Sequence, residues 1–341
     1  LYMARSRDEY SGWSEPAINL RTQVFDMAAA GCRAAMEIGA GSPIWELARS
    51  EQAYTFQRPG EYITSVLAGA IHAGWEGPVF IQGDHYQWNA KNYAKDPDQV
   101  TDALHKATLN AMSVGYGNID IDSSTLVDLS YESLDEQQKE NYTRAAELAA
   151  LIRENEELTI SIGGEIGEVG KNNSTPEELR AYLDGFNKDF AARAGADAIG
   201  LSKVSCQTGT SHGGVPTADG KVADVALDFD VLLELGKVAR EYGLAGAVQH
   251  GASTLPDELF HKFPEAETAE VHLATGFQNF LYEHDLFPAE RYAKVVEFCN
   301  TECADERSEG QTDVHFVYKT RKKALGPIKR DLWDLDVKDD I

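Results

Sequence analysis

Short apolar runs alternate with longer amphipathic stretches along most of the chain. The runs are rich in β-branched residues and predict seven strands, at 42–48, 78–84, 118–122, 158–165, 197–202, 245–250 and 269–274. The stretches between them carry apolar residues at helical spacing, as at Ile63, Leu67 and Ile71. An eighth strand is expected before a helix at about 17–38, and only residues 1–4 offer material for it.

This alternation predicts parallel βαβ units in one α/β domain. Because no linker interrupts the units, a (β/α)8 TIM barrel over residues 1–303 is favoured over a doubly wound sheet. A doubly wound nucleotide-binding sheet would carry a glycine-rich GxGxxG or GxxxxGK[ST] loop, and the chain has neither. The more polar residues 304–341 are interpreted as a C-terminal extension.

The composition of the chain indicates which classes of partner it can bind. The 341 residues are 43% hydrophobic, and no apolar run approaches the roughly 18 residues of a membrane span. The formal charge of −25 argues against nucleic-acid binding and fits an acidic, well-solvated surface, with salt adaptation as the alternative. No secretory signal core precedes residue 10, and the four cysteines form no CxxC pair, so free thiols in a cytoplasmic protein are expected.

Three histidines follow apolar runs, each where a strand is predicted to stop. His85 follows VFIQGD, His212 lies in TGTSHGG and His250 follows AGAVQ, while Glu165 ends the run LTISIGG. In a (β/α)8 barrel all strand C-termini open on one rim, so these side chains are expected to meet there. Taken singly, each histidine is more often a structural residue; taken together, they predict a metal site with an open position.

Asp84 directly precedes His85. A carboxylate beside a bound metal can give or take a proton on a substrate oxygen. The alternative is that Asp84 orients a histidine from behind or occupies a turn. We favour the catalytic interpretation.

Small residues fill two further segments of the predicted rim. Residues 251–254 read GAST, and residues 275–279 read TGFQN after the last strand. Loops after strands seven and eight, with free amides at a helix start, are the usual phosphate site of this barrel.

Six motifs match one family in order and spacing. They are GDH at 83–85, DIDSST at 120–125, GEIGEVG at 164–170, GTSHGG at 209–214, HGAS at 250–253 and EVHLATGFQN at 270–279. Over roughly residues 40–300 the chain therefore resembles the class II, zinc-dependent ketose-bisphosphate aldolases. The resemblance implies reversible aldol cleavage of a ketose bisphosphate, first of all fructose 1,6-bisphosphate, to dihydroxyacetone phosphate and an aldehyde phosphate.

The resemblance also implies roles for individual residues. His85, His212 and His250 match the zinc ligands, Glu165 a carboxylate at an alternative metal position, and Asp122 an acid near a second cation position. Asp84 matches the acid that handles the proton on the aldehyde oxygen. The expected contacts to phosphate, substrate or a monovalent cation are Ser50, Gly213, Gly251, Ser253, His272 and Thr275.

The chain departs from the family pattern in three places. A glutamate usual in a loop after the GEIG motif is replaced by KNNST at 171–175, which leaves the C3 proton carrier unassigned. An asparagine that usually contacts substrate in the last strand is His272, which alters the substrate contact or simply hydrogen-bonds in the rim. Third, the strand-one residues of the family have no clear counterpart. The distal phosphate also has no evident cation; Arg321, Lys322 or Lys323 can supply one, or can form a solvated basic face.

Two alternatives stay open. One is an aldolase for a different ketose phosphate, and the other is a non-catalytic barrel subunit that supports an aldolase. In each case we expect a homo-oligomer, a dimer or tetramer, that binds neither nucleic acid nor membrane.

Overall fold

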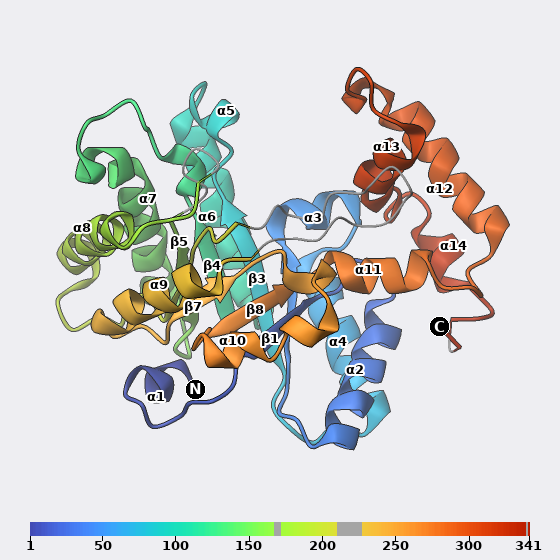
Figure 1. Ribbon diagram of the computed structural model, residues 1–341, viewed down its shortest axis with the longest axis horizontal. Helices are drawn as coiled ribbons and strands as arrows, with labels where there is room; N and C mark the ends of the chain where they lie inside the picture. Colours follow the sequence, from blue (N-terminus) through green and yellow to red (C-terminus); the bar gives the residue numbers. More distant parts are fainter. Residues whose placement is uncertain (167–171, 210–226, 339) are drawn as a thin grey trace.

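Eight parallel strands close into a barrel in this computed structural model, which describes residues 1–166, 172–209, 227–338 and 340–341 (Figure 1). The strands pair in chain order, and the last pairs with the first. They are β1 (Glu15–Asn19), β2 (Ile44–Ala48), β3 (Phe80–Gln87), β4 (Asn118–Asp122), β5 (Ser161–Glu165), β6 (Lys203–Ser205), β7 (Ala247–Gln249) and β8 (Glu270–Leu273). The predicted (β/α)8 TIM barrel is confirmed.

Helices follow the strands and cover the outside of the barrel. The helices before β5 are α1 (Tyr2–Ser6), α2 (Val24–Ile38), α3 (Arg49–Tyr54), α4 (Pro59–Ala73), α5 (Ala90–Tyr93), α6 (Pro97–Ser113) and α7 (Leu134–Asn155). Those after it are α8 (Pro176–Ala194), α9 (Phe229–Glu241), α10 (Lys262–Glu265), α11 (Thr275–Tyr282), α12 (Ala289–Glu302), α13 (Asp313–Thr320) and α14 (Lys329–Trp333). Thr175 caps α8 and Pro176 occupies its first turn.

Two strand predictions are wrong. Residues 1–4 are not a strand, because β1 lies at Glu15–Asn19, where buried and half-buried residues alternate. A strand at residues 197–202 is also wrong, because β6 comes after them, at Lys203–Ser205. Lys203 looks like the polar end of a strand in the sequence, but the folded barrel buries it completely.

The short helix α1 packs at the N-terminal end of the barrel. Arg5 donates hydrogen bonds to the carbonyls of Ala245, at 3.2 Å, and Thr268, at 3.0 Å. The Tyr2 hydroxyl donates to the carboxylate of Glu270. Residues from the first helix therefore contact residues near β7 and β8 at the N-terminal end of the barrel.

The main apolar core lies between the strands and the helices, and the C-terminal helices have a second core of their own. Cys299 and Cys303 share that second cluster with Phe316 and Leu332. Figure 1 shows α12, α13 and α14 grouped at one side, away from most of the strands. The division at residue 303 stays a prediction. All four cysteines are buried and free.

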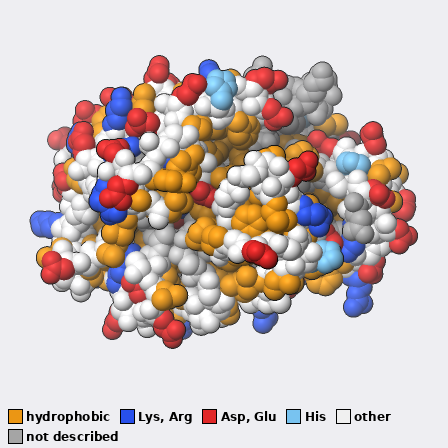
Figure 2. Space-filling model, turned by 90° about the horizontal axis from the view of Figure 1, so that it is seen from below, with side chains coloured by type: hydrophobic (Ala, Val, Ile, Leu, Met, Phe, Trp, Pro, Cys, Tyr) orange, Lys and Arg blue, Asp and Glu red, His pale blue; other side chains and the backbone are white. Residues whose placement is uncertain are grey.

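The surface is acidic around its edge. On the face seen in Figure 2, acidic side chains are scattered over the periphery and hydrophobic side chains gather nearer the middle. A groove of about 830 Å³ lies outside the barrel, with Phe25 of α2 and Phe280 of α11 in its lining. No helix in the described part of the chain is both long and apolar enough to cross a bilayer.

Candidate active site

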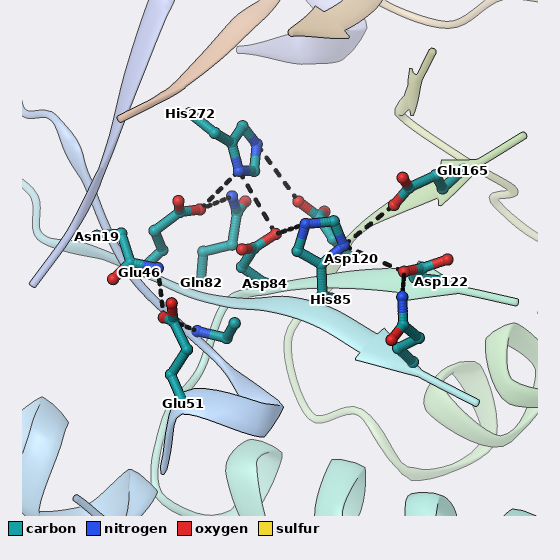
Figure 3. A network of polar contacts seen from close by, with 12 residues as sticks. Asn19, Glu46, Glu51, Gln82, Asp84, His85, Asp120, Asp122, Glu165 and His272 are labelled. Carbon is teal, nitrogen blue, oxygen red and sulfur yellow. Dashed lines mark hydrogen bonds and ion pairs between the residues drawn. The ribbon is translucent and has the colours of Figure 1, made fainter. Parts of the chain in front are cut away.

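A bulge in β3 brings two consecutive side chains to one site. On a regular strand Asp84 and His85 would point to opposite faces. The pairing of β3 with β4 shifts register between Gly83 and Tyr86, and His85 has a φ of 43°. An extra residue in a bulge re-aims a side chain, and a non-glycine residue in the left-handed region is strained. Asp84 and His85 therefore both face the carboxylates and imidazole drawn in Figure 3.

Gly83 makes this bulge possible. A Cβ atom at Gly83 would lie 2.3 Å from the ring of Tyr86, which is fully buried beneath the bulge. No real Cβ contact is that short, so a side chain at Gly83 would displace the strand. The motif GDH therefore has a steric reason for its glycine.

The predicted ligands from β3, β5 and β7 do meet. His85 Nδ1 lies 3.2 Å from Glu165 Oε2, and the ring centroids of His85 and His250 are 4.5 Å apart. Ligand atoms of His85, Glu165 and His250 all lie within 4.8 Å of one another, and we call this set the first metal group. Two other predicted site residues, His212 and Gly213, lie outside the described residues.

Asp122 stands behind His85. Its Oδ2 lies 3.2 Å from His85 Nδ1, while its Oδ1 accepts hydrogen bonds from the backbone amide and hydroxyl of Ser124. Burial raises the pKa of Asp122, but the hydrogen bond and charge of His85, together with hydrogen bonds from Ser124 and Gln87, outweigh burial and leave the pKa below its usual value. A charged carboxylate held in this way is suited to orient the imidazole of a metal ligand.

The pKa values of two members of the first metal group are strongly shifted. Burial alone would lower the pKa of His85, but the charges of Asp84 and Glu165 raise it well above its usual value. Burial, helped by repulsion from Asp122, raises the pKa of Glu165 to about 7. The protonation of the His85 imidazole and that of the Glu165 carboxyl therefore depend on each other. A bound cation would fix both groups in one protonation state and one orientation.

The residues present fit a zinc ion. Ligand atoms of His85, Glu165 and His250 lie within 4.8 Å of one another, so small movements bring all three to the distance of about 2.0–2.2 Å that zinc requires. The other nitrogen of the His85 ring is then left to donate to Asp122. A cavity of about 10 Å³ next to this group opens among Asp120, Glu165, Lys203 and His250 and has roughly the space of one water; the ammonium of Lys203 in its lining disfavours a cation there. Imidazole and carboxylate are also the donor types that zinc takes in catalytic sites.

A layer of charged residues inside the barrel, below the first metal group, was missed by the sequence analysis. Lys203 Nζ lies 2.7 Å from Gln82 Oε1 and 3.0 Å from Asp120 Oδ2, and it also pairs with Glu270. Burial lowers the pKa of Lys203, but the charges of Asp120 and Glu270 outweigh it and raise the pKa. Lys203 is therefore a paired ammonium and not a nucleophile.

A positional signal for part of this layer was present in the sequence. Asp120 comes two residues before Asp122, and Glu270 two residues before His272. Residues two apart on a strand share a face, so both belong to the barrel interior if their partners do.

His272 sits at the centre of this layer and is 3% exposed. Its Nδ1 lies 3.0 Å from Glu46 Oε2 and 3.5 Å from Asp84 Oδ1, and its Nε2 lies 2.7 Å from Glu270 Oε1. The ring centroids of His272 and His250 are 4.0 Å apart. Burial would lower the pKa of His272, but the surrounding carboxylates, Glu46 first, raise it well above its usual value.

The two loops predicted to bind phosphate pack against each other. Ser253 Oγ accepts a hydrogen bond of 3.0 Å from the backbone amide of Gly276, and Gly251 has a φ of 71°. Arg21, which the sequence analysis missed, donates to Thr275 Oγ1 at 3.4 Å. Arg21 lies two residues after β1, at a rim position hidden by the misplaced first strand.

The remaining predicted contacts are placed as follows. Ser50 is exposed in the first turn of α3, next to Glu51, which pairs with Arg21 at 2.7 Å. Arg321 is buried and pairs with Glu283, and Lys323 pairs with Glu306.

Lys322 is the third of the basic candidates. Burial, together with repulsion from Arg21, lowers its pKa, and its Nζ lies 6.0 Å from the ring centroid of Tyr54 in α3. This places Lys322 on the Arg21 side of the rim.

The closed barrel, with histidines and carboxylates clustered at its rim, places this chain among the TIM-barrel proteins whose rim residues can bind a metal ion. A family profile described as fructose-bisphosphate aldolase class-II matches residues 15–314. The chain belongs to this family. A search of curated proteins finds no match.

Solved structures share the fold at low sequence identity. A probable tagatose 6 phosphate kinase from Sinorhizobium meliloti 1021 is 19% identical, with a TM-score of 0.68 over 94% of this chain and 86% of that one. The fructose-bisphosphate aldolase of Campylobacter jejuni is 16% identical, with a TM-score of 0.53 over 98% and 93%. The fructuronate-tagaturonate epimerase UxaE of Cohnella laeviribosi is 11% identical, with a TM-score of 0.61 over 94% and 74%.

Proposed function

We propose that this protein is a zinc-dependent aldolase that reversibly cleaves a ketose bisphosphate, with fructose 1,6-bisphosphate as the first candidate. The products are dihydroxyacetone phosphate and an aldehyde phosphate. The observation that carries the proposal is the bulge in β3, which places Asp84 and His85 together beside Glu165 and His250. Membership of the class II aldolase family supports the reaction type.

The residues of the site have separate tasks in this proposal. His85, His250 and Glu165 hold the zinc, together with His212 as the sequence predicts, and Asp122 orients His85. When bound, zinc supplies a Lewis acid that polarises the ketose carbonyl. Asp84 accepts the proton from the C4 hydroxyl during cleavage and returns it to the aldehyde oxygen during condensation.

Phosphate binding requires local positive charge in a chain with a net charge of −25. The loop amides around Ser253 and Gly276 and the guanidinium of Arg21 meet at the start of α11. We propose that this corner takes one phosphate of the substrate, with Gly251, Ser253 and Thr275 in contact with it and a monovalent cation beside it. Lys322, on the Arg21 side of the rim, is the best placed of the three basic candidates for the other phosphate.

The proposal is tested by replacing Asp84 with Asn or Ala. We expect cleavage of fructose 1,6-bisphosphate to slow by about 10²–10⁴-fold, because a positioned acid–base group contributes about that much. Zinc content measured by mass spectrometry should stay near one ion per chain, and a chelator should abolish the wild-type activity. Asp128→Asn, an exposed carboxylate elsewhere, is the matched control. A metal-free wild-type protein that stays folded, or an unchanged rate in the Asp84 variants, contradicts the proposal.

An aldolase for a different ketose phosphate is the second candidate. It is favoured by His272, which places a bulky buried imidazole 3.5 Å from Asp84 where the family has an asparagine. An assay with a panel of ketose monophosphates and bisphosphates separates the two candidates. A non-catalytic supporting subunit is disfavoured, since such a subunit does not need Asp84 and the metal-type groups together.

We also propose that the chain forms a homo-oligomer. Phe25 and Phe280, beside the groove outside the barrel, are 37% and 66% exposed. Large apolar side chains exposed next to an apolar groove are typical of contact surfaces.

A further inference from the structure

The carboxylate of Asp84 extends from an irregular stretch of backbone. Asp84 follows Gly83 where the pairing of β3 with β4 shifts register, and the next residue, His85, has a φ of 43°. A group that moves a proton must be held within about 0.5 Å of its productive position by the side chains around it. The bulge fixes the backbone of Asp84, so the orientation of its carboxylate depends on the groups that pack against it.

His272 of β8 approaches Asp84 from inside the barrel (Figure 3). Its Nδ1 lies 3.5 Å from Asp84 Oδ1 and 3.0 Å from Glu46 Oε2. On the other side of the ring, Nε2 lies 2.7 Å from Glu270 Oε1. An ionised carboxylate only accepts hydrogen bonds, so an imidazole between carboxylates acts as a donor on both sides. The contact with Asp84 is longer than a hydrogen bond, and contacts at catalytic groups are often long before substrate binds and tighten afterwards.

Glu270 is the fixed end of this series of contacts. It is fully buried and accepts a hydrogen bond of 2.8 Å from Gln82 Nε2. The ammonium of Lys203 and the hydroxyl of Tyr2 also donate to it. Groups from α1, β3 and β6 therefore hold one carboxylate in place, and that carboxylate faces Nε2 of His272.

His272 is poorly placed to bind the substrate itself. It is 3% exposed, both of its ring nitrogens face carboxylate oxygens, and its ring lies against that of His250, with centroids 4.0 Å apart. A side chain buried in this way influences a reaction through a neighbour that does touch the substrate. Asp84 is the neighbour to which the proposed function gives the proton transfer.

We propose that His272 is a positioning residue for Asp84. Anchored by Glu270, the imidazole holds Asp84 Oδ1 toward the interior of the barrel, and this orientation presents Asp84 Oδ2 to the hydroxyl on C4 of the substrate. The inference rests on the proposed function, in which Asp84 accepts the proton of that hydroxyl.

Two amide side chains separate the two sides of the imidazole. The amide nitrogen of asparagine can take the place of Nδ1, and that of glutamine the place of Nε2. We expect His272→Gln, which has no donor toward Asp84, to lower kcat about 10–100-fold with KM within about twofold of the wild type, since loss of an outer partner has effects of that size. His272→Asn keeps that donor and should lose less. A raised KM with an unchanged kcat would mean that His272 contacts the substrate, and it overturns the inference.

A double-mutant cycle shows whether His272 acts through Asp84. In the Asp84→Ala background, adding His272→Gln should cost no further activity, because the group that it positions is gone. An equal loss in both backgrounds gives His272 a separate role and contradicts the proposal. If His272→Gln does not fold, His272→Ala, which also lacks the donor, replaces it in the cycle.

Two further readouts do not depend on activity. The zinc content of His272→Gln should equal that of the wild type, and a loss of zinc would assign the fall in kcat to the metal site instead. A crystal structure of His272→Gln should show the Asp84 carboxylate turned, and an Asp84 in its wild-type orientation argues against the proposal. The control is His105→Gln, which changes a half-buried histidine near Glu147, away from the site, and should match the wild type throughout.

The failure of this inference differs from the failure of the proposed function. The assays use fructose 1,6-bisphosphate or the ketose phosphate that the substrate panel selects. A wild-type protein that cleaves no ketose phosphate overturns the function, while the crystal structure of the variant still reports whether His272 orients Asp84. A wild-type protein that cleaves its substrate, with His272 variants that match it in kcat, overturns the positioning role alone.

Discussion

The buried charged side chains restrict which residues can stand beside them inside the barrel. A Cβ atom at Gly163 of β5 would lie 2.3 Å from Asp120 Oδ1 and 3.0 Å from the Lys203 side chain. Gly163→Ala should therefore separate this buried pair and destabilise the protein by about 1–3 kcal/mol, the usual cost of overpacking a core. The control is Gly117→Ala, where an added Cβ meets nothing within 4 Å. Equal midpoints of thermal or urea unfolding for the two variants would show that the Asp120–Lys203 pair does not constrain Gly163.

At the scale of elements, the start of α11 depends on the loop after β7. A Cβ atom at Gly276 would lie 2.4 Å from the carbonyl oxygen of Ser253. Gly276→Ala should push α11 away from this loop and misplace the phosphate contacts. We expect the KM for the ketose bisphosphate to rise between about tenfold and 100-fold, since displacements near 1 Å have effects of that size. Zinc content should not change. Gly60→Ala in α4, where the nearest contact is 3.8 Å, is the control, and a KM equal to that of the control would contradict the proposed phosphate corner.

The elements also show which parts of the structure the sequence predicts. The apolar runs predict six of the eight strands, and the histidines and glutamate at their ends predict the meeting of His85, Glu165 and His250. The buried charged residues inside the barrel could not be predicted from this pattern, because a polar residue in an apolar run is expected to face solvent unless its buried partner is known. Lys203 lies 121 residues from Gln82 and 67 from Glu270, and only closure of the barrel brings them together. Arg21 was missed because the strand before it was assigned to a helix.

The whole molecule should be less stable at neutral than at mildly acidic pH when no metal is bound. Burial, with repulsion from Glu270, raises the pKa of Glu15 to about 7, and the pKa values of Glu46 and Asp120 are also raised, to about 7 and about 6. A carboxyl with a raised pKa binds a proton on folding. Its contribution to stability is complete below about pH 4.5 and is lost as the pH rises through about 7.

Glu15→Gln tests this dependence away from the metal-type groups. Between pH 5 and 7, in chelator, the free energy of unfolding of the wild type should fall more steeply than that of the variant. The two slopes should differ by up to about 1.4 kcal/mol per pH unit, the value for one proton. Parallel slopes from urea unfolding at several pH values would show that Glu15 does not take up a proton on folding.

The helix α1 ties the beginning of the chain to strands made near its end, and this orders the steps of biosynthesis. Tyr2 bonds to Glu270, and Arg5 to the carbonyls of Ala245 and Thr268, so these contacts span 240 to 268 residues. At a synthesis rate of about 5–20 residues per second, tens of seconds pass before the partners of α1 exist. During that interval β1 has an unpaired edge on the side later covered by β8. Helix α1 is thus synthesised before all of its partners and is among the last elements to reach its native contacts, and the nascent barrel stays open until its eighth strand arrives.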